Sequence, residues 1–145
     1  MSNQYLLLDI GEQQYAVPME YVGYVVPSEG EYRSCTPPQM PFYINRIMSM
    51  EKKLVIVIDL ENIEKRDIGH KEIRPLVLVL NYQNRIIGLQ ADRITLMPEK
   101  SEPKLTKDEL NQCSLLHFSG KDFILLNVPH LLEKISTKEE YDCVL

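Results

Sequence analysis

The sequence predicts an all-β protein made of two five-stranded β-barrels, with a short helix near its C-terminal end. Two observations predict this class. Short apolar runs alternate with polar turns along most of the 145 residues, a pattern typical of strands. Two pairs of these segments also recur in the same order, which indicates a duplicated unit. About ten strands of the usual length fit the chain, and closing each sheet into a barrel removes exposed edges.

The clearest strand pair lies in the middle of the chain. Residues 76–80 (LVLVL) form an apolar run too short for a typical helix, residues 81–84 form a polar turn, and residues 85–91 are apolar again. This pattern predicts a β-hairpin with a loop of about four or five residues. Gly88, inside the second run, predicts a bulge or a close approach of another backbone.

This hairpin has a counterpart near the start of the chain. Residues 6–22 align with residues 78–94, because both carry an apolar run, a polar turn, a second apolar run, an acid and a branched residue. A second pair aligns at a similar spacing: residues 53–60 read KLVIVIDL and residues 121–128 read KDFILLNV. Any two hairpins share such features, but the common order and spacing favour two copies of one small β unit. The charged segment 61–74 is then the linker between copies, within one domain spanning residues 1–145.

The first copy is expected to contain strands at 4–10 and 13–17, a helical turn at 19–21, a strand at 23–26, a loop at 27–41, and strands at 43–50 and 54–60. Pro18 suits the start of the helical turn, because proline is favoured at the first helical position. The loop contains four prolines, which fix φ and remove ladder donors.

The second copy is expected to continue after its hairpin with a strand at 94–97, a charged loop at 98–107, hairpin strands at 110–118 and 122–127, and a helix at 128–135. Asn127 suits the cap of this helix, because its side chain can accept a hydrogen bond from the first turn. The segment that begins with Ser136 reads STKE, which is either a second capping box or a frayed end.

Composition excludes several classes of protein. The net charge of −5 and the pI of about 5.2 provide no basic stripe, so we expect no nucleic-acid partner. No apolar run approaches the roughly 20 residues of a membrane helix, so we expect no membrane insertion, and the N-terminus lacks the pattern of a signal peptide. Three widely spaced cysteines suit a reducing cytoplasm and form neither a disulfide framework nor a zinc motif.

The sequence contains no recognisable catalytic constellation. His70, His117 and His130 each lack a second histidine or a cysteine at metal-ligand spacing. There is no nucleophile elbow and no phosphate-binding glycine loop. Cys35 and Cys113 are expected to be packed or surface thiols. We therefore expect no enzymatic activity, no cofactor and no metal.

Recognition of other proteins is the remaining class of function. Met48 and Met50 alternate with Ile47 and Ser49, so both methionines point to one face of their strand. Methionine suits irregular cores, the first interpretation, and adaptable binding surfaces, the second. A groove between two barrels would accept the apolar face of a partner helix, and free strand edges would pair with another β domain.

Five segments, in order, carry a family resemblance: YAVP (15–18), PFYI (41–44), LVIVIDL (54–60), GLQADRI (88–94) and FILLNVPHLL (123–132). Over about residues 5–135 the chain resembles the family of the bacterial chemotaxis coupling protein CheW. The resemblance implies two five-stranded SH3-like barrels around a shared hydrophobic core. It also implies a cytoplasmic adaptor, monomeric in isolation, that couples the cytoplasmic tip of a methyl-accepting chemoreceptor to the regulatory domain of the histidine kinase CheA.

The chain departs from the family pattern at one turn, where the family has approximately Gly-x-x-Asn-x-Arg-Gly followed by a strand that contains proline. The corresponding residues here are Arg46 and Ser49 for the first glycine and the asparagine, Glu51 for the arginine, Lys52 for the second glycine, and Ile56 for the proline. The family arginine is tied to receptor coupling, and reversing a charge at an interface can cost several kcal/mol. The GLQADRI segment matches the family better, through Gly88, Asp92 and Ile94.

These patterns give a set of residues expected to contact a partner: Ile47, Met48, Met50, Glu51, Lys52, Ile87, Leu89 and Asp92. Two other functions stay open. One is a CheW-like scaffold for another two-component output, such as surface motility. The other is a β-barrel domain that binds a small ligand, which a bound molecule between the lobes or a metal on His70 would favour.

Overall fold

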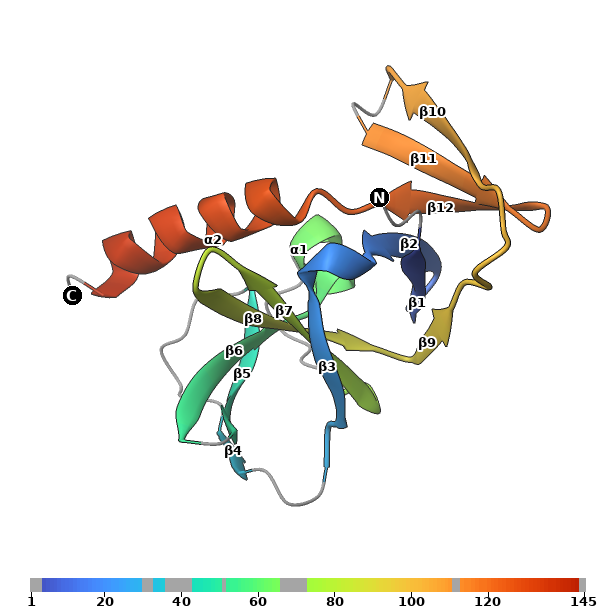
Figure 1. The fold of residues 1–145 in the computed structure, drawn as a ribbon. Helices are drawn as coiled ribbons and strands as arrows, with labels where there is room; N and C mark the ends of the chain where they lie inside the picture. Colours follow the sequence, from blue (N-terminus) through green and yellow to red (C-terminus); the bar gives the residue numbers. More distant parts are fainter. Residues whose placement is uncertain are drawn as a thin grey trace.

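The computed structural model describes residues 4–29, 33–35, 43–50, 52–65, 73–110 and 113–143. Within these residues, twelve strands form two six-stranded sheets (Figure 1). Sheet A contains, in spatial order, β10 (Lys104–Asp108), β11 (Cys113–Phe118), β12 (Lys121–Leu125), β2 (Gln13–Pro18), β1 (Tyr5–Ile10) and β9 (Arg93–Leu96). Sheet B contains β3 (Val22–Pro27), β7 (Leu76–Tyr82), β8 (Arg85–Ala91), β6 (Lys53–Ile58), β5 (Ile44–Met50) and β4 (Arg33–Cys35).

Three helices complete the described chain: the 3-10 helix η1 (Met19–Tyr21), α1 (Leu60–Lys65) and α2 (Val128–Cys143). The helical turn after Pro18 and the capping role of Asn127 are as predicted, since Asn127 Oδ1 accepts a hydrogen bond of 3.1 Å from the His130 backbone N–H. Helix α2 extends beyond the predicted end at residue 135, so Ser136 lies inside it instead of starting a new helix. None of the described helices has the length and apolar character needed to cross a membrane.

The two sheets have the same strand order when each strand of the first half is matched with the strand six places later. Each sheet combines the first hairpin of one half with four strands of the other half. The register matches too: Val57 of β6 pairs in parallel with Gly88 of β8, and Leu125 of β12 pairs in parallel with Ala16 of β2. The sequence alignment of the two copies matches Val57 with Leu125 and Ala16 with Gly88. The two halves of the chain thus correspond strand for strand, and each half contributes strands to both sheets.

The predicted fold class is confirmed: two β-sheet subdomains, of the kind found in SH3-like barrels, with a C-terminal helix. The predicted count of five strands per subdomain is an undercount. β4 has three residues and lies in the segment assigned to a proline-rich loop, while β10 (KLTKD) lies mostly in the segment assigned to a charged loop. Neither carries an apolar run. The first residues of the predicted 61–74 linker belong to α1, and residues 66–72 lie outside the described residues.

The hydrophobic core has three parts. The largest lies between the sheets and under α2, and it includes Leu8 and Tyr15 from sheet A, Leu78 and Leu89 from sheet B, and Leu132 from α2. Two smaller clusters fill the opposite face of each sheet. The expected core shared between subdomains is therefore present, and it fixes the sheets relative to one another.

Gly88 is crowded by valine side chains, not by another backbone as predicted. A Cβ atom at this position would lie 2.9 Å from Val77 Cγ1 and 3.3 Å from Val57 Cγ2. The absence of a side chain leaves room for valine side chains of β7 and β6, the two strands that pair with β8. A larger residue at position 88 would collide with these valine side chains unless they moved.

Candidate partner-binding surfaces

Four of the residues expected to contact a partner are buried. Met48 and Met50 are 0% and 1% exposed and pack in the cluster on one face of sheet B. Ile87 and Leu89 are 2% and 0% exposed and belong to the core shared with sheet A. The alternation along β5 correctly placed both methionines on one face, but that face points inward. These four side chains are core residues, and the expectation that they contact a partner is corrected.

The β5–β6 turn retains part of the predicted set at the surface. Ile47 is half-buried on β5, and its backbone lies opposite Ile56 of β6 and Cys35 of β4. Lys52 is exposed in the turn and adopts φ of 67°, a left-handed conformation that suits the glycine present there in the family pattern. Glu51 lies outside the described residues. Ile47 and Lys52 therefore remain available for contact, whereas the effect of Glu51 stays a prediction.

Asp92, the last predicted residue, lies where the chain passes from β8 in sheet B to β9 in sheet A. Its Oδ2 atom accepts hydrogen bonds from the Gly11 backbone N–H at 2.8 Å and from Arg74 Nη1 at 2.9 Å. Its backbone N–H donates to the Asp9 carbonyl at 2.8 Å. Asp92 thus ties the β1–β2 turn to sheet B. The match of GLQADRI to the family is explained by structure here, without any partner.

Arg74 is the centre of an ionic network between the sheets. Its side chain is 7% exposed and contacts three carboxylates: Asp59 at 2.6 Å, Asp92 at 2.9 Å and Glu61 at 3.1 Å. Burial alone would lower the pKa of the Arg74 guanidinium. The hydrogen bond to Asp59 and the charges of Asp59, Asp92 and Glu61 outweigh burial, so the pKa lies above its usual value. Arg74 is therefore a permanent cation in this junction.

Gln90 and Arg46 extend the same network deeper into sheet B. Gln90 Nε2 donates to Asp59 Oδ2 at 2.6 Å, and Gln90 Oε1 accepts from Arg46 Nη1 at 2.7 Å and from the Arg74 backbone N–H at 3.2 Å. Arg46 is 2% exposed, and this burial lowers its pKa although the charge of Asp59 acts in the opposite direction. Asp59 also caps α1, since its Oδ1 accepts from the Glu61 backbone N–H at 3.0 Å. These contacts extend the network within sheet B and α1, and its bonds to the β1–β2 turn of sheet A come from Asp92 and Glu61.

Exposed apolar side chains lie on edge strands of both sheets. Val25 on β3 is 43% exposed and Leu96 on β9 is 53% exposed. The two residues occupy equivalent positions in the two copies. Leu96 pairs with Leu6 of β1, and Val25 pairs with Leu78 of β7. Leu6 and Leu78 are aligned with each other in the duplicated sequence. Leu6 and Leu78 belong to the shared core, so the two exposed residues continue its apolar surface at its margins. The sequence predicted both strands but not this surface, because an apolar strand residue can lie in the core or at the surface and only packing decides between them.

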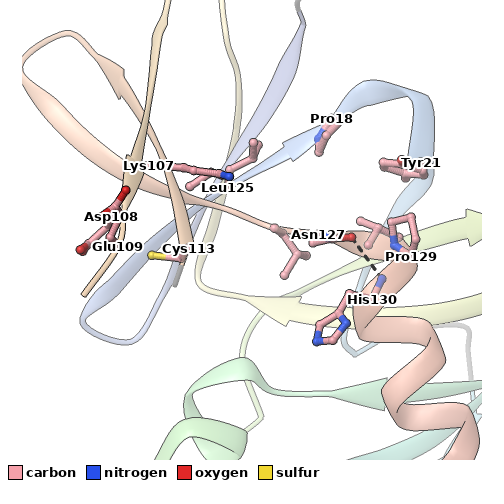
Figure 2. Close-up of a pocket in the computed structure, with 13 residues that line it drawn as sticks. Pro18, Tyr21, Lys107, Asp108, Glu109, Cys113, Leu125, Asn127, Pro129 and His130 are labelled. Atoms are coloured by element: carbon pink, nitrogen blue, oxygen red, sulfur yellow. Dashed lines mark hydrogen bonds between the residues drawn. The ribbon is translucent and has the colours of Figure 1, made fainter. Parts of the chain in front are cut away.

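A cavity with a volume of about 680 Å³ lies between sheet A and the start of α2. Figure 2 shows Asp108, Glu109 and Cys113, at the ends of β10 and β11, on one side, and Tyr21, Pro129 and His130 on the other. Burial, together with the charges of Glu20 and Tyr82, raises the pKa of the Tyr21 phenol. Of the histidines and cysteines singled out from the sequence, Cys113 and His130 line this cavity.

One constellation resembles a catalytic triad without forming a recognisable active site. His117 on β11 bonds to Asp122 on β12 through Nδ1, and its Nε2 lies 2.6 Å from Thr106 Oγ1 on β10. The Asp122 side chain is 65% exposed, so the group lies open to water on the sheet surface. These bonds join side chains of three neighbouring strands, and such cross-strand pairs stabilise a sheet without any catalytic role. Among the described residues, no group of three or more His, Cys, Asp or Glu side chains is placed to hold a metal ion.

Comparison with known proteins gives the family. The model of the CheW-like domain matches residues 4–136. Among solved structures, the scaffolding protein TtCheW from Thermoanaerobacter tengcongensis has a similar fold, with a TM-score of 0.66 and 18% sequence identity over 86% of this chain and 88% of that chain. A search of curated proteins gave no match. Because the family model covers most of the sequence, the chain belongs to the CheW-like domain family.

Proposed function

We propose that this protein is a non-catalytic adaptor that couples chemoreceptors to the histidine kinase CheA in bacterial chemotaxis. The observation that carries the proposal is the match of the CheW-like domain over residues 4–136. The similarity of the fold to TtCheW, a scaffolding protein, is in agreement with it. The adaptor would act in the cytoplasm, bind the cytoplasmic tip of a methyl-accepting receptor and the regulatory domain of CheA, and be monomeric when isolated.

The bonded and packed junction between the sheets suits an adaptor. An adaptor must present two surfaces in a fixed relation, so that a change at one partner reaches the other through a defined geometry. The Arg74 network and the shared core provide such a fixed relation. Binding through preformed surfaces also avoids the free-energy cost of ordering loops.

We assign the receptor-binding role to the margins of the shared core, at Val25 and Leu96. Partly exposed apolar residues that continue a core are suited to accept the apolar face of a helix. Both side chains are about half exposed, and complete burial of a Val or Leu side chain contributes about 1.5–3 kcal/mol. Each residue would therefore contribute about 1 kcal/mol to binding, equivalent to roughly fivefold in affinity.

Calorimetry with the purified full-length chain tests the proposal. We expect it to bind the regulatory domain of its cognate CheA, and a soluble fragment of its cognate receptor tip, with Kd values on the order of micromolar, as is typical of modest transient interfaces. Leu96→Asp should weaken receptor binding at least tenfold and leave CheA binding unchanged. Leu110→Asp, at a residue that is 92% exposed, is the matched control.

The possible outcomes test the adaptor role and the position of the receptor surface separately. Absence of heat with both partners would reject the adaptor role. Normal binding by Leu96→Asp would reject the receptor surface while leaving the adaptor role in place.

A further inference from the structure

The two helix caps occupy equivalent places in the two copies. Asp59 directly precedes α1, and Asn127, its counterpart when residues 53–60 are aligned with 121–128, directly precedes α2. Asp59 Oδ1 accepts from the Glu61 backbone N–H, and Asn127 Oδ1 accepts from the His130 backbone N–H. The surroundings of Asp59 and Asn127 can therefore be compared position by position.

Around Asp59, long polar side chains fill the space. Arg46 and Gln90 are 2% and 0% exposed there, and the Arg74 guanidinium bonds directly to the Asp59 carboxylate.

Shorter residues stand at the equivalent positions of the other copy. Ser114 is the counterpart of Arg46. Arg46 lies opposite Val57 on β6, and Ser114 lies opposite Leu125 on β12. Val57 and Leu125 are aligned with each other in the two copies. Pro18 is the counterpart of Gln90 when residues 6–22 are aligned with 78–94.

Ser114, Pro18 and Asn127 all line the 680 Å³ cavity of sheet A. The cavity is thus the counterpart of the space that the Arg46 guanidinium and the Gln90 amide fill in sheet B. Its shape follows from the substitution of short side chains for arginine and glutamine in a duplicated frame.

The charges around the cavity favour a cation. Asp108 and Glu109 lie on its rim with Lys107. A further carboxylate, Glu20, is close enough to hydrogen-bond with Tyr21 and aligns with Asp92 of the other copy. Tyr21 also lines the cavity (Figure 2), and an aromatic ring can attract a cation through its π system.

We propose that the cavity between β11, η1 and α2 binds a guanidinium group, presented by an arginine side chain of a partner protein. The partner's arginine would occupy the space that corresponds, in the other copy, to the one filled by the side chain of Arg46. Guanidinium fits this role better than ammonium because it is planar and can donate to several acceptors at once. The inference does not depend on the adaptor role.

The direct probe is N-acetyl-arginine amide, titrated into the full-length chain and followed by the backbone amide NMR signals. We expect saturable shifts at Ser114, Asn127 and His130, with a Kd on the order of 1–10 mM, which is reasonable for a single side chain. The citrulline analogue, which has the same shape without the charge, should produce at most a tenth of the affinity. Equal shifts with both compounds, or no saturation, would overturn the proposal.

Two variants test the comparison of the copies. Ser114→Arg places a guanidinium at the counterpart of Arg46, so it should occupy the cavity and abolish binding of the probe. Thr95→Arg, which adds the same charge on exposed β9, is the matched control and should bind as the wild type does. Asn127→Asp restores the carboxylate found at Asp59 and, since aspartate caps helices as well as asparagine, should tighten binding about threefold or more.

Binding by Ser114→Arg at the wild-type level would refute the proposed position. If Ser114→Arg fails to fold, the Asn127→Asp variant becomes the test of the proposal. Unchanged or weaker binding of the arginine probe by Asn127→Asp would refute the proposed attraction between the cavity and a cation.

Discussion

The Arg74→Met substitution gives the sharpest test of the junction between the sheets. It removes the cation and keeps most of the aliphatic volume. Asp59, which is 1% exposed, would then be a buried carboxylate without its ion pair. Removing one partner of a buried pair costs about 3–5 kcal/mol. Asp59 keeps its hydrogen bonds with Gln90 and the Glu61 backbone N–H, so the lower end of this range applies, about 3 kcal/mol.

The other two ion pairs of Arg74 add little to this figure. The side chains of Glu61 and Asp92 are 18% and 41% exposed, and ion pairs open to solvent contribute about 1 kcal/mol at most. A loss of about 3 kcal/mol is a large share of the roughly 5–15 kcal/mol that stabilises a typical domain. For a chain of this length it corresponds to a fall in Tm of about 6–12 °C.

Urea unfolding and calorimetry measure the effect, with Arg93→Met as the matched control. Arg93 is exposed on β9, so the same chemical change should alter stability by less than about 0.5 kcal/mol. The double variant Arg74→Met/Asp59→Asn should be more stable than Arg74→Met alone, because it removes the uncompensated charge. If the single variant loses less than about 1 kcal/mol, or if the double variant is the less stable, the network does not act as described.

Two further predictions concern the core and the cavity wall. Met48→Asp should prevent folding or cost more than about 4 kcal/mol of stability, because the carboxylate would replace a fully buried side chain. The control Leu54→Asp, at a residue that is 74% exposed, should be tolerated. Circular dichroism during urea unfolding compares the stability of the two variants. The raised pKa of Tyr21, caused by burial and then by Glu20 and Tyr82, means that the folded state holds the phenolic proton more tightly than the unfolded state. The resulting stability is present below pH 10.0, the ordinary tyrosine value, and is lost as pH rises through the higher folded pKa. The difference between the ultraviolet phenolate titrations of the wild type and Tyr21→Phe should show one late-ionising tyrosine, and a midpoint at or below pH 10.0 would contradict the assignment.

The fold class could be predicted from sequence because strand signals are local. The runs at 76–80 and 85–91 became β7 and β8, and the alignment of the two copies reappears in the pairing of β6 with β8 and of β12 with β2. β4 and β10 escaped prediction because their strand character comes from neighbours that pair with them. The residues of β4 and β10 themselves therefore do not predict a strand.

The partner site was harder to predict than the fold. An apolar residue on a strand is equally suited to a core and to a surface, and only packing decides between them. Met48 and Met50 had the right alternation but face inward, whereas Val25 and Leu96 are exposed because β3 and β9 are edge strands. The Arg74 network could not be read from sequence either, since its members come from segments far apart in the chain.

The exchange of hairpins between the sheets has a consequence for synthesis on the ribosome. Sheet A is complete only when Leu125 meets Ala16, so the first hairpin must wait for β12 to emerge before it gains its final neighbour. Contacts between such distant positions are slow to form because a long loop must close first. The nascent chain therefore exposes the apolar faces of β1 and β2 during most of translation, and it should depend on chaperones or late folding more than two barrels formed one after the other would.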